Sequence, residues 1–600
     1  MTVPRRTFPV GFGLLVFWWA VTLSPVVAEE MKAGVAPKGV AAKTSNKVQP
    51  RTAAQEEKTI AEKEEGQNLR LFRRTHLINN TPPKVRPLHA AFVLPPEEVP
   101  AVSEPRADPA LQVNVTSLTP TAVGNVKSTI NEPSLAVTKR NEVLFTGNWY
   151  GSVSRSGPSG LSYVSPENTF PNSPFAYCCD QVALYSEKHD LLIWFLQYRQ
   201  RTATTGNIVR IAVANQADIA AGQWTYYDFA PTDLGPWSDE WFDFPDVAAT
   251  DKNLYVTTNS FKNTGSGFGR AVAFRIPLDQ LAAKAATITP DVFSRSQSFS
   301  FRLTQGATDT MYFASHDFSN YGERVELFTW ADAAANPNRS TAKVQIWSDD
   351  DYLSECLDKV GNTPTVWLSG NRTDPRMTAG WVQGKEVGFA WTASRGNGFA
   401  HPHVRVAVVD MATTAAERTP VAQPHLQNTA YAFATPAASL SRDGKTVGLT
   451  VCYGGGRVKN PSQAVGVLMK DGTTYSWKLA TAGAEGSSGP SSKMWGDYCA
   501  ARPDPRFNNV FVASGWTMEG GREMANVTPR FVTFSLGTPD QVTPGEVGTG
   551  GNTIKADVLA EIKKLEDQHT AMKVAIDALK AKVATMPDVP PAVAPAVPKK

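Results

Sequence analysis

Short runs of β-branched and aromatic residues, bounded by Gly, Pro, Asn and Asp, recur between residues 125 and 536. Clear examples are 142–146, 191–196, 253–258 and 510–514. This pattern is typical of β-strands separated by turns. Amphipathic helix patterns are nearly absent from the region, apart from a short one at 277–286. A region of this length with so little helix predicts an all-β domain, built as a pair of sandwiches, a β-helix or a propeller.

A repeated motif decides among these folds. Each copy has a polar or charged residue, a short apolar strand, a turn and a second apolar strand. The copies begin at 131–137, 179–185, 244–250, 301–303, 374–379, 437–440 and 495–500. Spacings of roughly 50 to 75 residues fit four-stranded blades with long loops, whereas a β-helix repeats at much shorter intervals. We therefore predict a β-propeller over 124–540 with seven blades. Because the fourth copy is weak, six or eight blades stay open.

After the Gly-rich segment 541–552 the pattern becomes helical. Between residues 553 and 587, apolar residues alternate at spacings of four and three, with His569 among them. This spacing is the seam of a left-handed coiled coil, so we predict a homo-oligomer formed through this helix. A helix that packs back on its own propeller is the alternative. Residues 588–600 form a Pro/Ala-rich tail.

The N-terminal part has two sections. Arg5 and Arg6 precede an apolar run from Val10 to Val27, which ends in small residues before Glu29. This order predicts a secretory signal peptide at 1–28, a secreted protein, and no transmembrane span in the mature form. An uncleaved membrane anchor is the alternative, since the run is close to spanning length.

Residues 29–123 are rich in Ala, Lys, Glu and Pro and nearly lack aromatic residues, with one helical pattern at 53–74. Such a composition buries too little apolar surface to offset chain entropy. We therefore expect a disordered or weakly helical stalk, or a propeptide that is cleaved off.

The composition limits the kinds of partner that the protein can bind and indicates what stabilises its fold. The net charge is only +3 over 600 residues, and the basic residues are scattered, which argues against a nucleic-acid partner. Five cysteines are too few for a disulfide-built scaffold, so the core must be hydrophobic. The odd number leaves at least one thiol without a partner in the same chain.

Two of the cysteines, Cys178 and Cys179, are neighbours at a predicted strand start. A bond between them would close a small rigid ring, an apolar platform beside the channel mouth. Alternatively, one of them pairs with Cys499, or Cys452 pairs with Cys499. Buried thiols that fill space are a further alternative.

In a propeller, the first strand of each blade lines the central channel, so the residues that open these strands gather at its mouth. By the repeat pattern, the catalytic candidates are Glu132, Asp180, Asp246, Asp497 and Tyr498. The substrate-binding candidates are Gln181, Arg302, Asp374 and Arg376. Acids and arginines together suit acid/base chemistry on a sugar, pairing with acidic substrate groups, or binding of Ca²⁺. The alternative is that these residues form turns and ion pairs between blades.

Histidines give weaker candidates. His316 could act as a base, because it is followed by Asp317 and ends a predicted strand. His401 and His403 lie on one face of a strand, but no third ligand follows at a diagnostic spacing. We therefore assign no metal site and no certain cofactor.

Three strand-opening segments resemble secreted propellers of the sialidase-like (BNR) type: Cys178-Cys179-Asp180-Gln181, Phe244-Pro245-Asp246-Val247 and Trp495-Gly496-Asp497-Tyr498. The resemblance extends from Asn131 to Leu536 and concerns blade architecture. It implies a six- or seven-bladed fold whose members include glycoside hydrolases, polysaccharide lyases and non-catalytic proteins. Fold likeness by itself does not choose among these activities.

The sequence departs from sialidases in two respects. Their Asp-boxes have the form Ser-x-Asp-x-Gly-x-x-Trp, and the nearest segments here, 441–446 and 471–477, are degenerate. Phe274-Arg275-Ile276-Pro277 matches the sialidase Phe-Arg-Ile-Pro motif, but it lies late in the third blade instead of before the first. We interpret this match as coincidental, and the three sialidase arginines cannot be assigned.

Two functional hypotheses follow. In the first, the protein acts on extracellular glycans at the channel mouth by glycoside hydrolysis, which needs two carboxylates. Elimination from a uronic acid, with Tyr498 or His316 as base, is a less favoured variant. In the second, the protein is a non-catalytic scaffold that binds glycans or proteins and gains avidity from its coiled coil.

Overall fold

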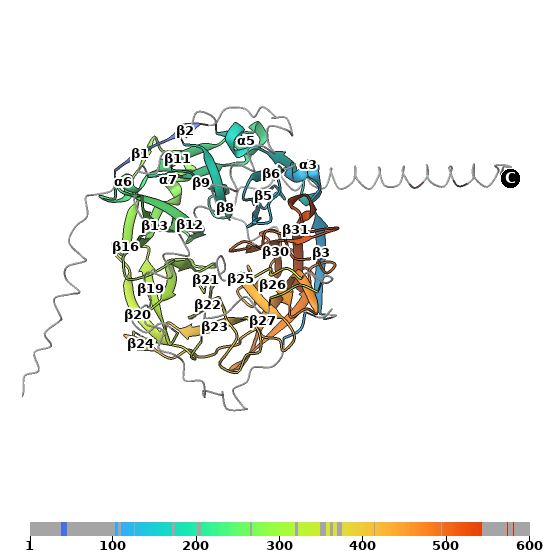
Figure 1. Cartoon of the computed structure of the whole chain (residues 1–600). Helices are drawn as coiled ribbons and strands as arrows, with labels where there is room; N and C mark the ends of the chain where they lie inside the picture. The colour runs from blue at the N-terminus through green and yellow to red at the C-terminus, as the bar shows by residue number, and fades with distance from the viewer. Residues whose placement is uncertain are drawn as a thin grey trace, which may run out of the picture. The chain divides into compact units, whose positions relative to one another are not determined.

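A computed structural model of the chain describes residues 38–44, 103–542, 573 and 580. The gaps in the second range are 106–107, 109, 125, 171–174, 201–205, 264–266, 318–321, 348–355, 360–363, 369–374, 413 and 494. The strands of the long range form seven sheets set around a common centre (Figure 1). This arrangement confirms the predicted seven-bladed propeller. The predicted signal peptide, the helix at 53–74 and the C-terminal tail lie outside the described residues, as does the coiled coil except for Lys573 and Lys580.

Each blade is one sheet, numbered here in chain order. Blade 1 consists of β4 (Ser134–Val137), β5 (Val143–Gly147), β6 (Tyr150–Ser154) and β7 (Ser162–Val164). Blade 2 consists of β8 (Tyr177–Ser186), β9 (Leu191–Tyr198), β10 (Val209–Ala214), β11 (Thr225–Phe229) and β2 (Lys43–Thr44). Blade 3 consists of β12 (Glu240–Ala249), β13 (Asn253–Lys262), β14 (Phe268–Pro277) and β16 (Asp291–Arg295). Blade 4 consists of β17 (Arg302–Leu303), β18 (Thr310–His316), β19 (Arg324–Ala331), β20 (Asn338–Lys343) and β24 (Glu417–Arg418).

The remaining blades complete the ring. Blade 5 consists of β21 (Met377–Gln383), β22 (Glu386–Ala393) and β23 (His403–Asp410). Blade 6 consists of β25 (Ala432–Leu440), β26 (Val447–Gly455), β27 (Lys459–Asp471) and β28 (Thr474–Thr481). Blade 7 consists of β29 (Ala501–Pro503), β30 (Val510–Met518), β31 (Val527–Leu536) and β3 (Leu111–Ser117). A separate pair joins β1 (Val40–Ala41) to β15 (Thr287–Ile288).

Helices are short and lie between strands. They are α3 (Pro120–Val123), η2 (Pro158–Gly160), α4 (Pro166–Thr169), α5 (Gln216–Ala221), α6 (Pro231–Leu234), α7 (Leu278–Ala282) and η4 (Met524–Asn526). The helix α7 lies within the helical pattern at 277–286. No helix in the described part of the chain combines the length and the apolar composition needed to cross a membrane.

The core lies between the blades. The second strand of blade 2, β9, is buried at every position, because both of its faces are covered. Its residues divide between two apolar clusters: Trp194 belongs to a cluster shared with blade 1, and Phe195 to one shared with blade 3. This two-sided burial explains why β9 is an uninterrupted apolar run in the sequence rather than an alternating one.

The entrance to the innermost strand has the same irregularity in several blades. A non-glycine residue with a positive φ of 43° to 59° stands there in five of them: Glu132, Cys179, Phe244, Ser300 and Thr435. The strand register also breaks next to this residue in blades 2, 3 and 6. Such a bulge bends the strand and re-aims its side chains. The repeat found in the sequence therefore corresponds to a repeated bulge around the axis of the ring.

The N-terminal boundary predicted at residue 124 is wrong. The strand β3 pairs antiparallel with β31, from Leu111 opposite Leu536 to Ser117 opposite Arg530, and so completes blade 7. In addition, β1 and β2 pair with β15 and β11. These segments of the predicted stalk 29–123 are ordered because sheet edges far away in the sequence supply their hydrogen-bonding partners.

Candidate functional site

The Glu132 carboxylate links blade 1 to the segment that leads into blade 7. Glu132 Oε2 accepts a hydrogen bond from Asn148 Nδ2 at 2.9 Å, and Glu132 Oε1 accepts one from the backbone N–H of Asp497, also at 2.9 Å. Both residues are buried, with 1% and 6% of their surface exposed. The Glu132 carboxylate thus meets the backbone of Asp497, although 365 positions separate the two residues in the chain.

An arginine lies beside this pair. The Arg376 guanidinium stands 3.9 Å from Asp497 Oδ2. It also lies over the Phe244 ring, 3.9 Å from the ring centre, and 5.5 Å from that of Phe299. The Tyr498 ring meets Phe244 edge-on at 6.0 Å. Residues at the strand entrances of blades 3, 4, 5 and 7 therefore converge around one guanidinium.

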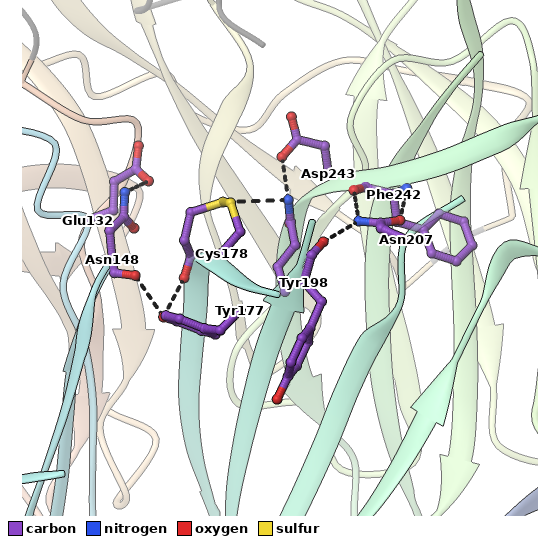
Figure 2. The surroundings of a disulfide bond; sticks show 10 residues. Glu132, Asn148, Tyr177, Cys178, Tyr198, Asn207, Phe242 and Asp243 are labelled. Carbon is purple, nitrogen blue, oxygen red and sulfur yellow. Dashed lines mark hydrogen bonds between the residues drawn. A yellow bond between two sulfur atoms is a disulfide. The ribbon is translucent and has the colours of Figure 1, made fainter. Parts of the chain in front are cut away.

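A disulfide joins Cys178 to Cys179 beside these residues. Figure 2 shows it between Glu132 on one side and Asp243 on the other. The Tyr177 hydroxyl lies 2.7 Å from the carbonyl oxygen of Asn148 and 2.9 Å from that of Cys179. Burial raises the pKa of Tyr177 well above its ordinary value, and the negative charge of Asp180 adds to the effect.

Of the cysteine pairings that the sequence left open, the structure contains the bond between the adjacent residues Cys178 and Cys179. Cys452 and Cys499 are buried and are not joined to each other. The Trp495 indole N–H instead donates to Cys452 Sγ at 3.2 Å. A hydrogen bond from the Cys499 thiol lowers the pKa of Cys452.

His316 contacts the segment that immediately precedes Arg376. Its Nε2 lies 2.6 Å from the carbonyl oxygen of Pro375, the residue before Arg376. Its ring packs against Trp347 at 4.7 Å and against Trp391 at 5.2 Å between centres. Burial lowers the pKa of His316 to about 4. These contacts favour a role in positioning Arg376 over the predicted role as a base.

Asp246 and Arg302 bind each other and join two neighbouring blades. Asp246 Oδ1 accepts a hydrogen bond from its neighbour Val247 N, and Oδ2 accepts one from Leu303 N, both at 2.9 Å. Arg302 Nε lies 3.2 Å from Asp246 Oδ2. These contacts favour a role for Asp246 in joining β12 to β17 over the catalytic role that the sequence predicts.

The Gln181 side chain also forms hydrogen bonds that hold neighbouring strands together. Its Nε2 donates to the carbonyl oxygens of Gly147 and Tyr150 in blade 1, and its Oε1 accepts from Trp194 Nε1 at 2.7 Å. A substrate-binding role is therefore disfavoured. Asp180, next to it on β8, is 4% exposed and stays a candidate. Asp374 lies outside the described residues.

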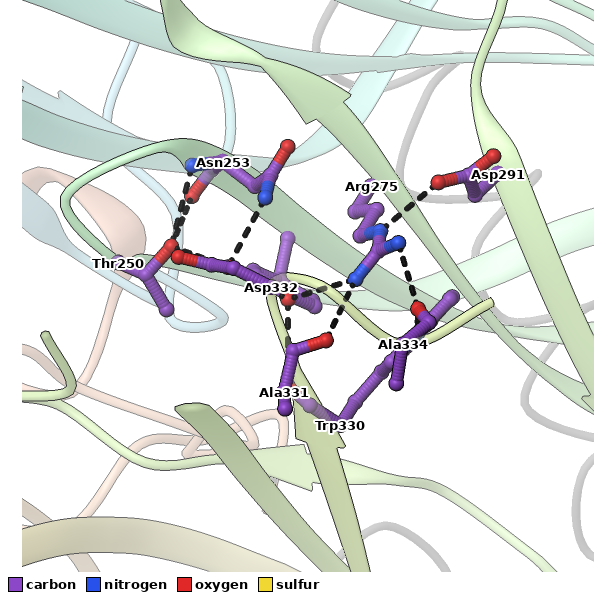
Figure 3. Close-up of polar contacts among 9 residues, drawn as sticks. Thr250, Asn253, Arg275, Asp291, Trp330, Ala331, Asp332 and Ala334 are labelled. Carbon is purple, nitrogen blue, oxygen red and sulfur yellow. Dashed lines mark hydrogen bonds and ion pairs between the residues drawn. The ribbon is translucent and has the colours of Figure 1, made fainter. Parts of the chain in front are cut away.

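The Phe-Arg-Ile-Pro match does not contribute to the site. Arg275 pairs with Asp291 at 2.9 Å and donates to the carbonyl oxygens of Ala331 at 3.0 Å and Ala334 at 2.7 Å (Figure 3). Arg275 lies on β14, the third strand of blade 3, opposite Tyr255 of β13. Tyr255 is in turn opposite Ala248, which lies at the end of β12 away from the strand entrance. The Arg275 guanidinium holds blade 3 to blade 4.

The described residues include no group of three or more His, Cys, Asp or Glu side chains arranged to hold a metal. His401 and His403 do not point to a shared ligand. The His403 ring stacks on Phe399 at 3.7 Å, and His401 Nε2 lies 3.2 Å from the carbonyl oxygen of Thr429.

The repeat pattern did not identify the two phenylalanines next to Arg376 as site residues. Phe244 occupies the same place in its repeat as Glu132, since each precedes a proline and then the strand. Aligning the repeats on this proline would have placed Phe244 at the mouth. Phe299 has no such signal, because its repeat lacks the proline.

No protein-family model and no curated protein matches this chain. Among solved structures, it is similar to an α-L-arabinofuranosidase of Fusarium graminearum, at 8% identity and a TM-score of 0.35 over 69% of this chain and 96% of the other. It is similar to a Trypanosoma rangeli sialidase at 9% identity, with a TM-score of 0.31 over 70% and 58%. It is also similar to the N-terminal domain of Nup159 at 6% identity, with a TM-score of 0.33 over 73% and 97%. At these values the activity has to be inferred from the site itself.

Proposed function

We propose that this protein is a secreted propeller that hydrolyses glycosidic bonds at the strand-entrance end of its ring. The observation that carries the proposal is the convergence of Glu132 and Asp497 beside Arg376. Glycoside hydrolysis needs a carboxylic acid that protonates the leaving oxygen and a carboxylate that attacks or activates water. Glu132 and Asp497 are the proposed pair of acids, supported by the hydrogen bond from the Asp497 backbone to Glu132, and Asp180 is a further candidate.

The surroundings suit a sugar. A sugar ring has apolar C–H faces and a rim of hydroxyl groups, so its site combines apolar surface with a few directed polar groups. The apolar groups at this end of the ring are the Cys178–Cys179 disulfide and the Phe244 ring, which are buried, and the Phe299 ring, which is half-buried. Arg376 supplies positive charge for a hydroxyl or an acidic substituent. Elimination from a uronic acid is less favoured, because the Pro375 carbonyl occupies Nε2 of His316.

The test is a screen for sugar release from arabinans, xylans, sialylated glycans and uronate polysaccharides. Glu132→Gln and Asp497→Asn should each lower kcat by about 100-fold or more, the usual size of an acid/base contribution. Asp410→Asn is the matched control, since Asp410 is exposed at the end of β23. Full activity of both site variants would refute the assignment of the pair.

One observation favours a non-catalytic glycan-binding role as the second candidate. Both carboxylate oxygens of Glu132 already accept hydrogen bonds from the protein. Under this alternative, a glycan from the same screen binds without being cleaved, and Arg376→Met weakens its binding. Release of product from that glycan would exclude the alternative.

A further inference from the structure

The start of β8 binds the tip of the β5–β6 hairpin in blade 1. This tip is the tight turn between Gly147 and Tyr150, which are paired across the hairpin. The Tyr177 hydroxyl lies 2.7 Å from the carbonyl oxygen of Asn148, in the turn. Gln181 Nε2 donates to the carbonyl oxygens of Gly147 and Tyr150. Two side chains of β8 therefore bind three carbonyl groups of the hairpin tip.

The same hairpin tip holds Glu132. The backbone N–H of Asn148 donates to the carbonyl oxygen of Asn131 at 2.8 Å, and Asn148 Nδ2 donates to Glu132 Oε2 at 2.9 Å. Asn148 is thus bound to Tyr177 through its carbonyl group and to Glu132 through its side chain. All three residues of this path are 1% exposed, so bulk water competes little for these hydrogen bonds.

The disulfide fixes a second contact of the Tyr177 hydroxyl. The carbonyl oxygen of Cys179 lies 2.9 Å from this hydroxyl. The Cys179 backbone has a positive φ of 59°, which a residue other than glycine rarely adopts. The bond to Cys178 closes a small covalent ring around the peptide unit between the two cysteines. This ring restricts the rotation that would turn the Cys179 carbonyl away from Tyr177.

We propose that Tyr177, held by the Cys178–Cys179 disulfide, is a positioning residue for Glu132 and acts through Asn148. The inference rests on the proposed function, in which Glu132 is one of the two acids. Figure 2 shows the path from the disulfide to the Tyr177 hydroxyl, and from there to Asn148. A catalytic carboxyl works only in a narrow range of positions, so the groups that fix its hydrogen-bonding partner control turnover.

Removal of the Tyr177 hydroxyl tests this path by kinetics. Tyr177→Phe keeps the aromatic ring, which packs edge-on against Trp149 and Tyr198. With a glycan that the unaltered protein cleaves, kcat should fall by about 10-fold or more, since a misplaced catalytic group slows the reaction by at least this factor. KM should stay within about twofold, because the sugar contacts are unchanged.

The matched control is Tyr198→Phe. This change also removes a buried hydroxyl of blade 2, but that hydroxyl accepts from Arg210 Nη1 at 2.7 Å and has no printed link to the hairpin tip. Its kcat should equal that of the unaltered protein. Equal kcat values for Tyr177→Phe and Tyr198→Phe, whether lowered or not, would overturn the proposal.

Crystal structures of the variants give a readout that needs no substrate. In Tyr177→Phe the Glu132 carboxylate should move out of hydrogen-bonding distance of Asn148 Nδ2, which is 2.9 Å from it in the unaltered chain. In Tyr198→Phe this hydrogen bond should remain. An unchanged hydrogen bond in Tyr177→Phe would overturn the proposal.

The disulfide is tested in the same way. The double variant Cys178→Ser, Cys179→Ser should displace Glu132 as Tyr177→Phe does, because the Cys179 carbonyl is released. Retention of the Glu132 position in this variant would overturn the role of the disulfide. Failure of the proposed function has a different sign: the unaltered protein would release no sugar, while the crystal structures would still decide whether Tyr177 positions Glu132.

Discussion

His316 illustrates how burial determines the behaviour of one side chain. Its ring is enclosed by Trp347 and Trp391 and bonded to the Pro375 carbonyl. Burial disfavours the charged form, which is why its pKa falls to about 4 from the ordinary 6.5. The neutral ring then keeps the segment before Arg376 in place.

This shift predicts a loss of stability in acid. Between pH 6.5 and pH 4 the unfolded chain binds a proton at this histidine that the folded chain does not, so stability falls as the pH falls through that window. From pH 7.5 to pH 5 the loss due to His316 should be about 2 kcal/mol. Urea unfolding at both pH values measures it, and His316→Gln should reduce the pH dependence by that amount. An unchanged pH dependence in the variant would contradict the prediction. Part of the dependence should persist, because His403 and His425 are also buried with lowered pKa values.

At the scale of strands, polar side chains at the entrances join neighbouring blades. Asp246 connects β12 to β17 through the Leu303 amide and the Arg302 guanidinium. Gln181 connects β8 to blade 1 in a similar way. These contacts join adjacent blades through hydrogen bonds and an ion pair at the start of the innermost strands.

Asp246→Asn should therefore reduce stability more than it affects any activity. The change removes the negative charge next to Arg302 and leaves this buried cation without its carboxylate, which costs about 3 kcal/mol. The free energy of unfolding, measured by urea titration, should fall by that amount. Asp410→Asn serves again as the exposed control. A stable Asp246→Asn protein that has lost sugar release would instead restore the catalytic assignment.

Strand β3 closes the ring by joining an N-terminal segment to the C-terminal blade. Its pairing with β31 covers an edge strand that would otherwise expose unpaired N–H and C=O groups. Leu111 is buried, and Val113 and Val115 pack against the same cluster of blade 7. Closure of this kind lets the last blade stabilise the first.

Removal of residues 1–118 should consequently open the ring. We expect a lower Tm and aggregation through the exposed edge of β31, both measurable by thermal unfolding with light scattering. Removal of residues 1–102 is the control, because it leaves β3 intact. Equal Tm values and equal scattering for the two truncations would show that closure does not depend on β3.

At the scale of the molecule, the propeller and the C-terminal segment are separate units, with the division after Asp540. We predict that the coiled-coil segment carries self-association. Deleting residues 553–600 should leave a folded propeller with the mass of a monomer, as measured by analytical ultracentrifugation. The apolar stripe is too narrow to be stable alone in water, which favours pairing with another copy.

The same sedimentation measurement, repeated at several pH values, tests the role of His569. His569 lies in the predicted seam, where protonation would bury a charge. Association of the full chain should weaken as the pH falls through about 6.5. Equal monomeric masses for the full and shortened chains would contradict the oligomer and remove the main support for a multivalent scaffold.

Local patterns in the sequence determined the architecture of the ring. Alternating runs and turn residues marked the strands, and the polar residue at the start of each repeat marked the seven innermost strands. These features depend on near neighbours in the chain, so they can be read without knowing the fold. The fourth repeat was weak because its innermost strand, β17, has only two residues.

The tertiary structure alone decided which residues meet. Asp246 was grouped with the catalytic acids because it opens a strand, yet its Oδ1 accepts from the adjacent Val247 N–H and its Oδ2 is bound by Leu303 and Arg302 of β17. The role of β3 was hidden because its partner β31 lies at the other end of the propeller. The disulfide pairing was also open, since several cysteines were predicted to lie near one mouth. The contacts of Asp246 and of β3 join segments that are distant in the chain, so they form only when the blades pack together. The disulfide joins adjacent residues, and the structure decided only which of the alternative cysteine pairings is present.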